Sequence, residues 1–145
     1  NISSVNTSGW ELDVLWRKKM TSNLFGQIGL SYTFLDTENP EESVYLSNHA
    51  NHLVNAQALF RYNWLDISMG CIFKERNTRI STSIGEELDD SYFVSHLRLG
   101  FRPTETIGIH IQIQNLGDTK YQNFLGAPMP SRWFMAGINW NLDIE

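Results

Sequence analysis

The strongest constraint on the fold of this sequence is a period-two alternation of apolar and polar residues that recurs seven times. In residues 107–113 every odd position is isoleucine, whereas the even positions are glycine, histidine and glutamine. Successive side chains of a β-strand point to opposite faces, so a period of two indicates a strand with one apolar face. We therefore predict an all-β chain.

Seven segments follow this pattern, with turn residues between them. The predicted strands lie at residues 9–17, 24–35, 52–62, 65–76, 92–102, 107–113 and 134–140. Short turns at 18–23, 63–64 and 103–105 alternate with long loops at 36–51, 77–91 and 115–133. In an antiparallel up-and-down meander this alternation places every long loop at the same end of the sheet.

Charge is confined to one of the two predicted faces. No charged residue falls on the apolar face of any predicted strand, and the opposite face carries Glu11, Asp13, Arg17, Arg61, Asp66, Lys74, Arg76, Arg98 and Arg102. Lipid enforces such a partition, because Lys or Arg on the lipid face of a barrel costs roughly 2 to 4 kcal/mol at the bilayer midplane. The pattern favours a transmembrane barrel.

Aromatic residues lie near the ends of the apolar rows, and the middles are aliphatic or small. The predicted lipid-facing girdle consists of Trp10, Trp16, Tyr32, Phe34, Phe60, Tyr62, Phe73, Phe93, Phe101, Phe134 and Trp140. Aromatic rings at both margins of an apolar band are typical of membrane interfaces. Only the strand at 107–113 contributes no aromatic residue.

The composition excludes several other classes. The mean hydropathy is −0.30, but alternating strands hide a membrane face from any such average. No run of about 18 apolar residues is present, so a membrane-spanning helix is not expected. The net charge of −5 argues against a nucleic-acid partner. The single cysteine, Cys71, cannot form an internal disulfide.

Seven strands are not expected to form a complete barrel. Bacterial single-chain barrels have even strand numbers, and an open sheet would leave two unpaired edges in the bilayer. The sequence also begins at Asn1 without an initiator methionine or signal peptide, so we expect a fragment or a processed product. The seven strands should therefore be part of a larger barrel.

The stretch from Asn115 to Trp140, NLGDTKYQNFLGAPMPSRWFMAGINW, resembles the C-terminal end of TonB-dependent outer-membrane receptors. The matching positions are Asn115, Leu116, Lys120, Tyr121, Met129, Pro130 and Arg132. Ser131 stands where the family usually has glycine, and the chain continues to Glu145 where members usually stop at a terminal aromatic. Weaker similarity covers residues 9–12, 31–36 and 49–52.

This resemblance implies that residues 1–145 are about the last third of a 22-stranded barrel in the bacterial outer membrane. Such receptors import a scarce nutrient, typically an iron-siderophore complex, haem, cobalamin or a glycan. The implied partners are outer-membrane lipid, the receptor's own plug domain, the TonB energy-transducing complex and the imported small molecule. The chain contains neither the plug nor the coupling box, and no cofactor or enzymatic activity is implied.

Recognition residues are expected in the long loops, because loops commonly carry binding function. The candidates are Tyr45, Asn48, His49, Tyr121, Asn123 and Phe124. His49 and His52 lack the accompanying ligands of a metal site, and the acidic loop residues lack calcium-loop spacing. Residues on the charged face, such as Asp66, Lys74, Arg76, Arg98 and Gln112, either contact the plug or form salt bridges within the barrel wall.

Two other functions fit parts of the pattern. A soluble barrel of lipocalin type would turn the apolar face inward around a small ligand. An outer-membrane phospholipase or protease would need a serine or an acidic dyad at the loop end. The sequence has neither a Gly-x-Ser-x-Gly elbow nor a phosphate-binding glycine loop, so no catalytic residue is predicted.

Overall fold

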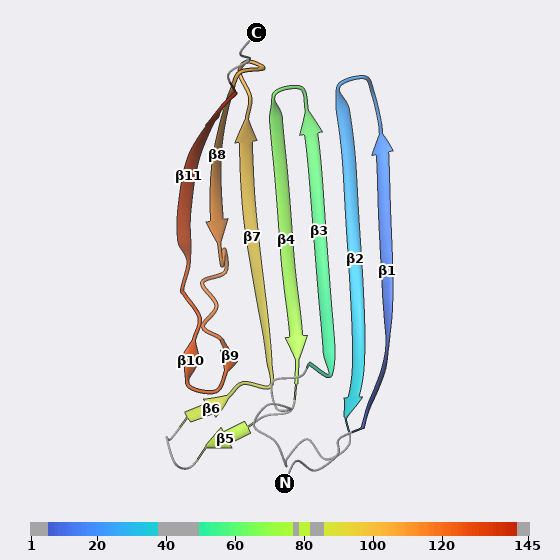
Figure 1. Ribbon diagram of the computed structural model, residues 1–145, viewed down its shortest axis with the longest axis vertical. Helices are drawn as coiled ribbons and strands as arrows, with labels where there is room; N and C mark the ends of the chain where they lie inside the picture. Colours follow the sequence, from blue (N-terminus) through green and yellow to red (C-terminus); the bar gives the residue numbers. More distant parts are fainter. Residues whose placement is uncertain (1–5, 38–49, 77–78, 82–85, 142–145) are drawn as a thin grey trace.

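The chain forms one large antiparallel sheet, shown in the computed structural model of Figure 1, which describes residues 6–37, 50–76, 79–81 and 86–141. Seven strands follow one another as neighbours in sequence order. They are β1 (Thr7–Lys19), β2 (Leu24–Thr37), β3 (His52–Tyr62), β4 (Leu65–Glu75), β7 (Ser91–Phe101), β8 (Ile107–Gln114) and β11 (Trp133–Trp140). This confirms the predicted all-β meander. Among the described residues, no helix is long and apolar enough to cross a membrane.

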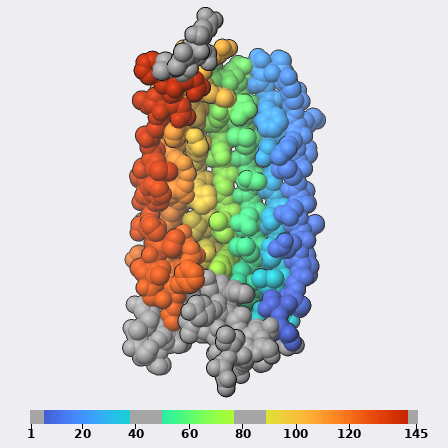
Figure 2. All heavy atoms as spheres, viewed as in Figure 1, coloured from blue at the N-terminus to red at the C-terminus, as the bar shows by residue number. Residues whose placement is uncertain are grey.

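The connections alternate as predicted. The tight turns β1–β2, β3–β4 and β7–β8 lie at the upper end in Figure 1, and the N-terminal ends of β1, β3, β7 and β11 lie at the lower end. We call these the short-turn end and the long-loop end. In the space-filling view of Figure 2 the strands form neighbouring columns from blue to red.

Two of the predicted long loops contain additional short strands. β5 (Arg79–Ser81) pairs with β6 (Glu86–Leu88), and β9 (Gln122–Phe124) pairs with β10 (Ala127–Pro128). Strands of two or three residues are too short to produce a recognisable alternation, so the prediction of plain loops was wrong here. Both hairpins lie outside the seven-stranded sheet.

The register confirms that the predicted apolar positions form one continuous face. Val14 pairs with Leu30, Leu30 with Ala56, and Ala56 with Cys71, and the main sheet contains no register shift. Large apolar side chains on this face are exposed, among them Leu30 (48%) and Ile138 (73%). An apolar surface of this extent requires a cover.

The predicted aromatic girdle lies near both margins of this face. At the long-loop margin Trp10 pairs with Phe34, and Phe73 with Phe93. At the short-turn margin Trp140 pairs with Ile107. Tyr32 lies in the row of Phe73 and Phe93, and Tyr62 lies in one row with Phe101, next to the row of Phe60. Trp16 and Phe134 share a row further from the margins, which passes through Ile28, Ala58, Met69, Leu97 and Ile113.

The partition of charge is less complete than predicted. β1 and β2 extend beyond their predicted limits, and the register brings Lys18 and Asp36 into the apolar rows, opposite Gly26 and Ser8. Glu75, which lies inside the predicted fourth strand, falls in these rows as well, opposite His52. All three lie at strand ends, where a strand can continue after its apolar band has ended. The polarity of Lys18 and Asp36 resembles that of a turn, which is why the sequence placed the ends of these two strands too early.

On the opposite face, polar side chains lie across glycines of neighbouring strands. A Cβ atom on Gly29 would stand 2.9 Å from Nε2 of Gln57, and one on Gly137 would stand 2.5 Å from Cε1 of His110. No real Cβ tolerates the second distance without a shift of its neighbour. These glycines let long polar side chains lie flat against the sheet.

Candidate functional site

The long-loop end is built on an exposed strand edge that residues 115–121 cover. β7 pairs with β8 only from Leu97 to Phe101, so its first part has no partner on that side. Instead, the Leu116 amide donates to the Ser95 carbonyl oxygen at 2.7 Å. The Thr119 hydroxyl donates to the Phe93 carbonyl oxygen at 2.8 Å. The loop thereby satisfies backbone groups that would otherwise form an open edge.

Asn115 organises this turn. It is 3% exposed and has a φ of 52°, a left-handed conformation that asparagine tolerates better than most residues. Its Nδ2 donates to the carbonyl oxygens of Thr119 (2.8 Å) and Pro130 (3.2 Å). Its Oδ1 accepts from the Thr119 amide at 2.9 Å. The two ends of the loop are thus joined by one side chain.

Ser131, which stands where the resembling family usually has glycine, does not adopt a backbone conformation that requires glycine. The Asp118 carboxylate accepts from the Arg132 amide at 2.7 Å and holds the chain next to this residue. Within the described residues, positive φ angles occur at Asn63, Asn115, Asp118 and Gly126, and not at Ser131. A serine therefore fits where the resembling family usually has glycine.

Arg76 is the most buried cation of the described residues. It directly follows β4, is 3% exposed, and its amide donates to the Asp90 carbonyl oxygen at 2.7 Å. Its guanidinium donates to three further carbonyl oxygens, those of Asp89 (3.0 Å), Gln122 (2.7 Å) and Asn123 (3.2 Å). Burial lowers the pKa of Arg76, and Tyr92 and Asp89 oppose that shift. Arginine is not deprotonated in proteins, so the guanidinium stays charged.

Two tyrosines extend this contact. The Arg76 guanidinium carbon lies 5.5 Å from the ring centroid of Tyr92, within the range of a cation–π interaction. The Tyr92 ring lies 4.7 Å from that of Tyr121, and its hydroxyl donates to Oδ1 of Asn123 at 2.8 Å. We call Arg76, Tyr92, Tyr121 and Asn123 the Arg76 cluster.

The structure separates the predicted recognition residues into three groups. Tyr121 and Asn123 are half-buried and belong to the Arg76 cluster. Phe124 is 62% exposed at the tip of the β9–β10 hairpin. Tyr45, Asn48 and His49 lie outside the described residues. Sequence reasoning did not single out Tyr92 and did not assign a loop contact to Arg76; the one available signal was a cation at the junction of a strand and a long loop.

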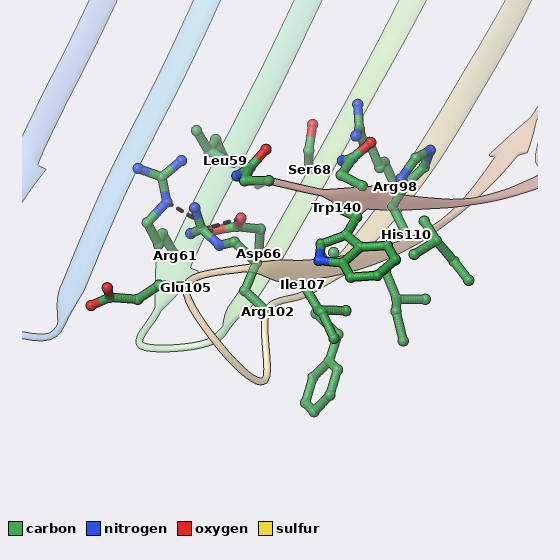
Figure 3. A pocket seen from close by; sticks show the side chains of 17 residues that line it. Leu59, Arg61, Asp66, Ser68, Arg98, Arg102, Glu105, Ile107, His110 and Trp140 are labelled. Atoms are coloured by element: carbon green, nitrogen blue, oxygen red, sulfur yellow. Dashed lines mark hydrogen bonds and ion pairs between the residues drawn. The ribbon is translucent and has the colours of Figure 1, made fainter. Parts of the chain in front are cut away.

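The short-turn end carries a different arrangement of charge (Figure 3). Asp66 accepts from Nε of Arg61 at 2.8 Å and pairs with Arg102 at 3.0 Å. These three residues line an open hollow of about 790 Å³, together with Arg98, Glu105, His110 and Trp140. The sequence left two roles open for residues of the charged face, contact with the plug and salt bridges within the barrel wall. Asp66 forms salt bridges within the wall.

Of the three histidines in the described ranges, one makes a side-chain contact and two have a buried ring nitrogen without a partner. Nδ1 of His52 lies 2.6 Å from the Tyr32 hydroxyl on the apolar face. Nδ1 of His96 and Nδ1 of His110 are buried against the sheet without a hydrogen-bond partner. Across the described segments, no group of three or more His, Cys, Asp or Glu side chains is arranged to hold a metal ion.

Comparison with solved structures defines the class of fold. No protein-family model matches the chain, and no curated protein sequence matches it. Solved barrels of TonB-dependent receptors do match, over 94% of this chain. The chain spans 19% of their length, and the sequence identity of 11–12% establishes the fold alone. The predicted resemblance to this class of receptor is confirmed at that level.

Three of the matching structures are of FpvA, the ferripyoverdine receptor of the outer membrane of Pseudomonas aeruginosa. FpvA bound to heterologous pyoverdines matches with a TM-score of 0.68 at 11% identity. The receptor bound to ferripyoverdine matches with a TM-score of 0.67, and the FpvAI–pyocin S2 complex with 0.68, both at 12% identity. In each case the match covers 94% of this chain and 19% of the receptor chain.

Proposed function

We propose that residues 1–145 are the C-terminal segment of a TonB-dependent receptor barrel in the bacterial outer membrane, which imports a scarce nutrient by energy coupling. The observation that supports this most directly is the continuous, exposed apolar face with aromatic margins, on a sheet whose fold is that of ferripyoverdine receptor barrels. Lipid would cover the apolar face, and the plug domain of the full-length receptor would face the charged one.

The nutrient in this proposal is a metal chelate or cofactor of the kinds that such receptors import: an iron-siderophore complex, haem or cobalamin. The similar structures carry ferripyoverdine, which makes an iron-siderophore the first choice. The contacts would come from the long-loop end, with Phe124 as the exposed candidate and with Tyr45, Asn48, His49, Tyr121 and Asn123 as the others. The receptor would act as a transporter and not as an enzyme.

Uptake by cells tests the transport proposal. Cells that express the intact protein, and cells that lack it, are given ferripyoverdine, haem and cobalamin with and without a protonophore. We expect import of one of the three probes to depend on the protein and to stop when the proton-motive force is dissipated. Import of all three that is independent of the protein would contradict the proposal.

A matched pair of substitutions tests the lipid-facing assignment. Leu30 lies on the apolar face, and its neighbour Ser31 lies on the opposite one. In the intact protein in phospholipid vesicles, Leu30→Arg should lower the free energy of unfolding by roughly 2 to 4 kcal/mol. Ser31→Arg should have a much smaller effect. Equal losses for the two variants would contradict the lipid-facing assignment of Leu30.

A further inference from the structure

We propose that Arg76 is a positioning residue that joins residues 89–90, at the end of the segment between β4 and β7, and the β9–β10 hairpin of the segment between β8 and β11 into one unit. The proposal rests on the proposed function in one respect, because it takes the long-loop end to be the side where ligand binds. The structural part concerns this chain alone.

The β9–β10 hairpin has little stability of its own. It consists of three residues paired with two, and it is not hydrogen-bonded into the seven-stranded sheet. An isolated two-stranded hairpin is marginal in water even when it is longer. Its position on the sheet must therefore be held by contacts outside the hairpin.

Arg76 supplies contacts of this kind to both loops at once. Its amide and Nε hold the end of the β4–β7 segment through the carbonyl oxygens of Asp90 and Asp89. The other two guanidinium nitrogens hold β9 through the carbonyl oxygens of Gln122 and Asn123. Arg76 thus contacts residues 46 and 47 positions further along the chain while it holds the end of its own segment.

The shape of the side chain matters as much as its charge. A guanidinium presents five N–H donors in a planar fork, so its nitrogens can reach three separate carbonyl oxygens. A lysine ammonium concentrates its donors on one atom. Tyr92 packs against the guanidinium and donates to Asn123, which fixes the hairpin from a second side.

The consequence concerns Phe124, the exposed residue at the hairpin tip. With Arg76 in place, the hairpin and residues 89–90 move together and present one preformed surface. Without it, the contacts that remain include the Tyr92–Asn123 hydrogen bond, the contact between the Tyr92 and Tyr121 rings and the turn at Asn115. Preformed surfaces bind with a smaller ordering cost.

The test measures motion of the hairpin in the intact receptor in phospholipid vesicles, without ligand. A spin label is placed at Phe124→Cys in a Cys71→Ser background, and amide hydrogen exchange is followed at residues 121–130. Arg76→Gln and Arg76→Lys should both mobilise the label and speed exchange of the hairpin amides at least ~10-fold, because charge-assisted hydrogen bonds are lost. Arg61→Gln at the short-turn end is the matched control and should leave both readouts unchanged.

Exchange at residues 27–34 of β2 reports whether the sheet is intact in each variant. Unchanged label mobility and exchange in Arg76→Lys, with an intact sheet, would overturn the proposal. Arg76→Lys retains the charge and the stem, so it keeps the experiment decisive if Arg76→Gln does not fold. A fully protected hairpin in a folded Arg76→Lys variant would show that the guanidinium is not needed to hold the hairpin.

The outcome is separable from that of the uptake experiment. If none of the three probes is imported by the wild-type protein, the transport proposal fails while the motion of the hairpin still decides the role of Arg76. If a probe is imported, Arg76→Lys should reduce its uptake at limiting concentration several-fold, and Arg61→Gln should not.

Discussion

The two ends of the sheet both contain arginine, but they use it differently. At the long-loop end Arg76 is 3% exposed and donates to main-chain carbonyl oxygens of two loops. At the short-turn end the side chains of Arg61 and Arg102 are 48% and 46% exposed, and they share one carboxylate, that of Asp66. One end therefore orders its backbone through a buried cation, and the other pairs charges in contact with water.

This difference follows from the length of the connections. The tight turn at Asn63–Trp64 pairs its backbone with the neighbouring connections, because the Asn63 amide donates to the Asn23 carbonyl oxygen and the Trp64 carbonyl oxygen accepts from the Arg102 amide. Side chains there are free to pair with one another. A long loop leaves many amides and carbonyls without a ladder, and side chains must supply the partners. The long-loop end consequently depends on Asn115, Thr119 and Arg76, and we expect substitutions there to have the larger effects.

Asn115→Ala should have the largest effect of the substitutions at the two ends. It removes three hydrogen bonds to Thr119 and Pro130 at a buried position and places alanine in a left-handed conformation. The loss should be about 3 kcal/mol, given the cost of unsatisfied buried groups and of this φ. Urea unfolding of the intact protein in vesicles measures it. Asn115→Asp keeps the acceptor, so its unfolding free energy should lie between those of the wild-type protein and Asn115→Ala. A loss for Asn115→Ala that is smaller than that for Asp66→Asn would contradict the comparison of the two ends.

Asp66→Asn should have a smaller effect, in spite of removing two ion pairs. Both arginine partners are nearly half exposed, and such pairs contribute up to about 1 kcal/mol each. The loss should diminish in high salt, because exposed charges are screened. The same unfolding experiment at low and high salt measures this, with Glu105→Gln as a control in the same hollow. A loss that is independent of salt would mean that the network is sealed from water.

Thr119→Val sharpens the comparison within the long-loop end. It replaces the hydroxyl that donates to the Phe93 carbonyl oxygen with a methyl group of similar size. A single hydrogen bond of this kind contributes about 1 kcal/mol. Amide exchange at residues 93–96 should rise, whereas Thr119→Ser should retain wild-type exchange. No change in Thr119→Val would show that water caps the β7 edge as well as the hydroxyl does.

Asn63→Gly should have the smallest effect. Asn63 has a φ of 48° in the β3–β4 turn, a conformation that glycine adopts freely and asparagine tolerates. The change in unfolding free energy should stay within about 0.5 kcal/mol, and Asn63→Ala should lose more, about 1 kcal/mol. Parallel unfolding curves of the two variants decide this. A large loss for glycine would assign the Asn63 side chain a role that the turn geometry does not show.

Much of the fold could be predicted because period-two patterns depend on local sequence alone. The strand at 52–62 was predicted to the residue, since polar His52 and the Asn63 turn bound a clear alternation. The ends of β1 and β2 were less predictable, because Lys18 and Asp36 carry the polarity of turns while the ladder continues through them. The short strands β5, β6, β9 and β10 left no pattern to detect.

The candidate site was less predictable for a related reason. Phe124 was chosen as a loop residue; it ends the short strand β9, and its exposure keeps it a candidate for ligand contact. Tyr121 and Asn123 were chosen on the same ground, yet they pack with Tyr92 in the Arg76 cluster. Whether a loop residue faces outward depends on how the loop folds back, which composition does not encode.

The sequence by itself determined the all-β meander, the alternation of short and long connections, and the separation of an apolar from a charged face. Each of these follows from residue type at a spacing of two, which one strand expresses without its neighbours. Only the tertiary structure decided that Asn115 joins the two ends of its loop and that Arg76 joins two loops. Those contacts link residues from 4 to 47 positions apart, and a separation of that kind is resolved by the path of the chain in space.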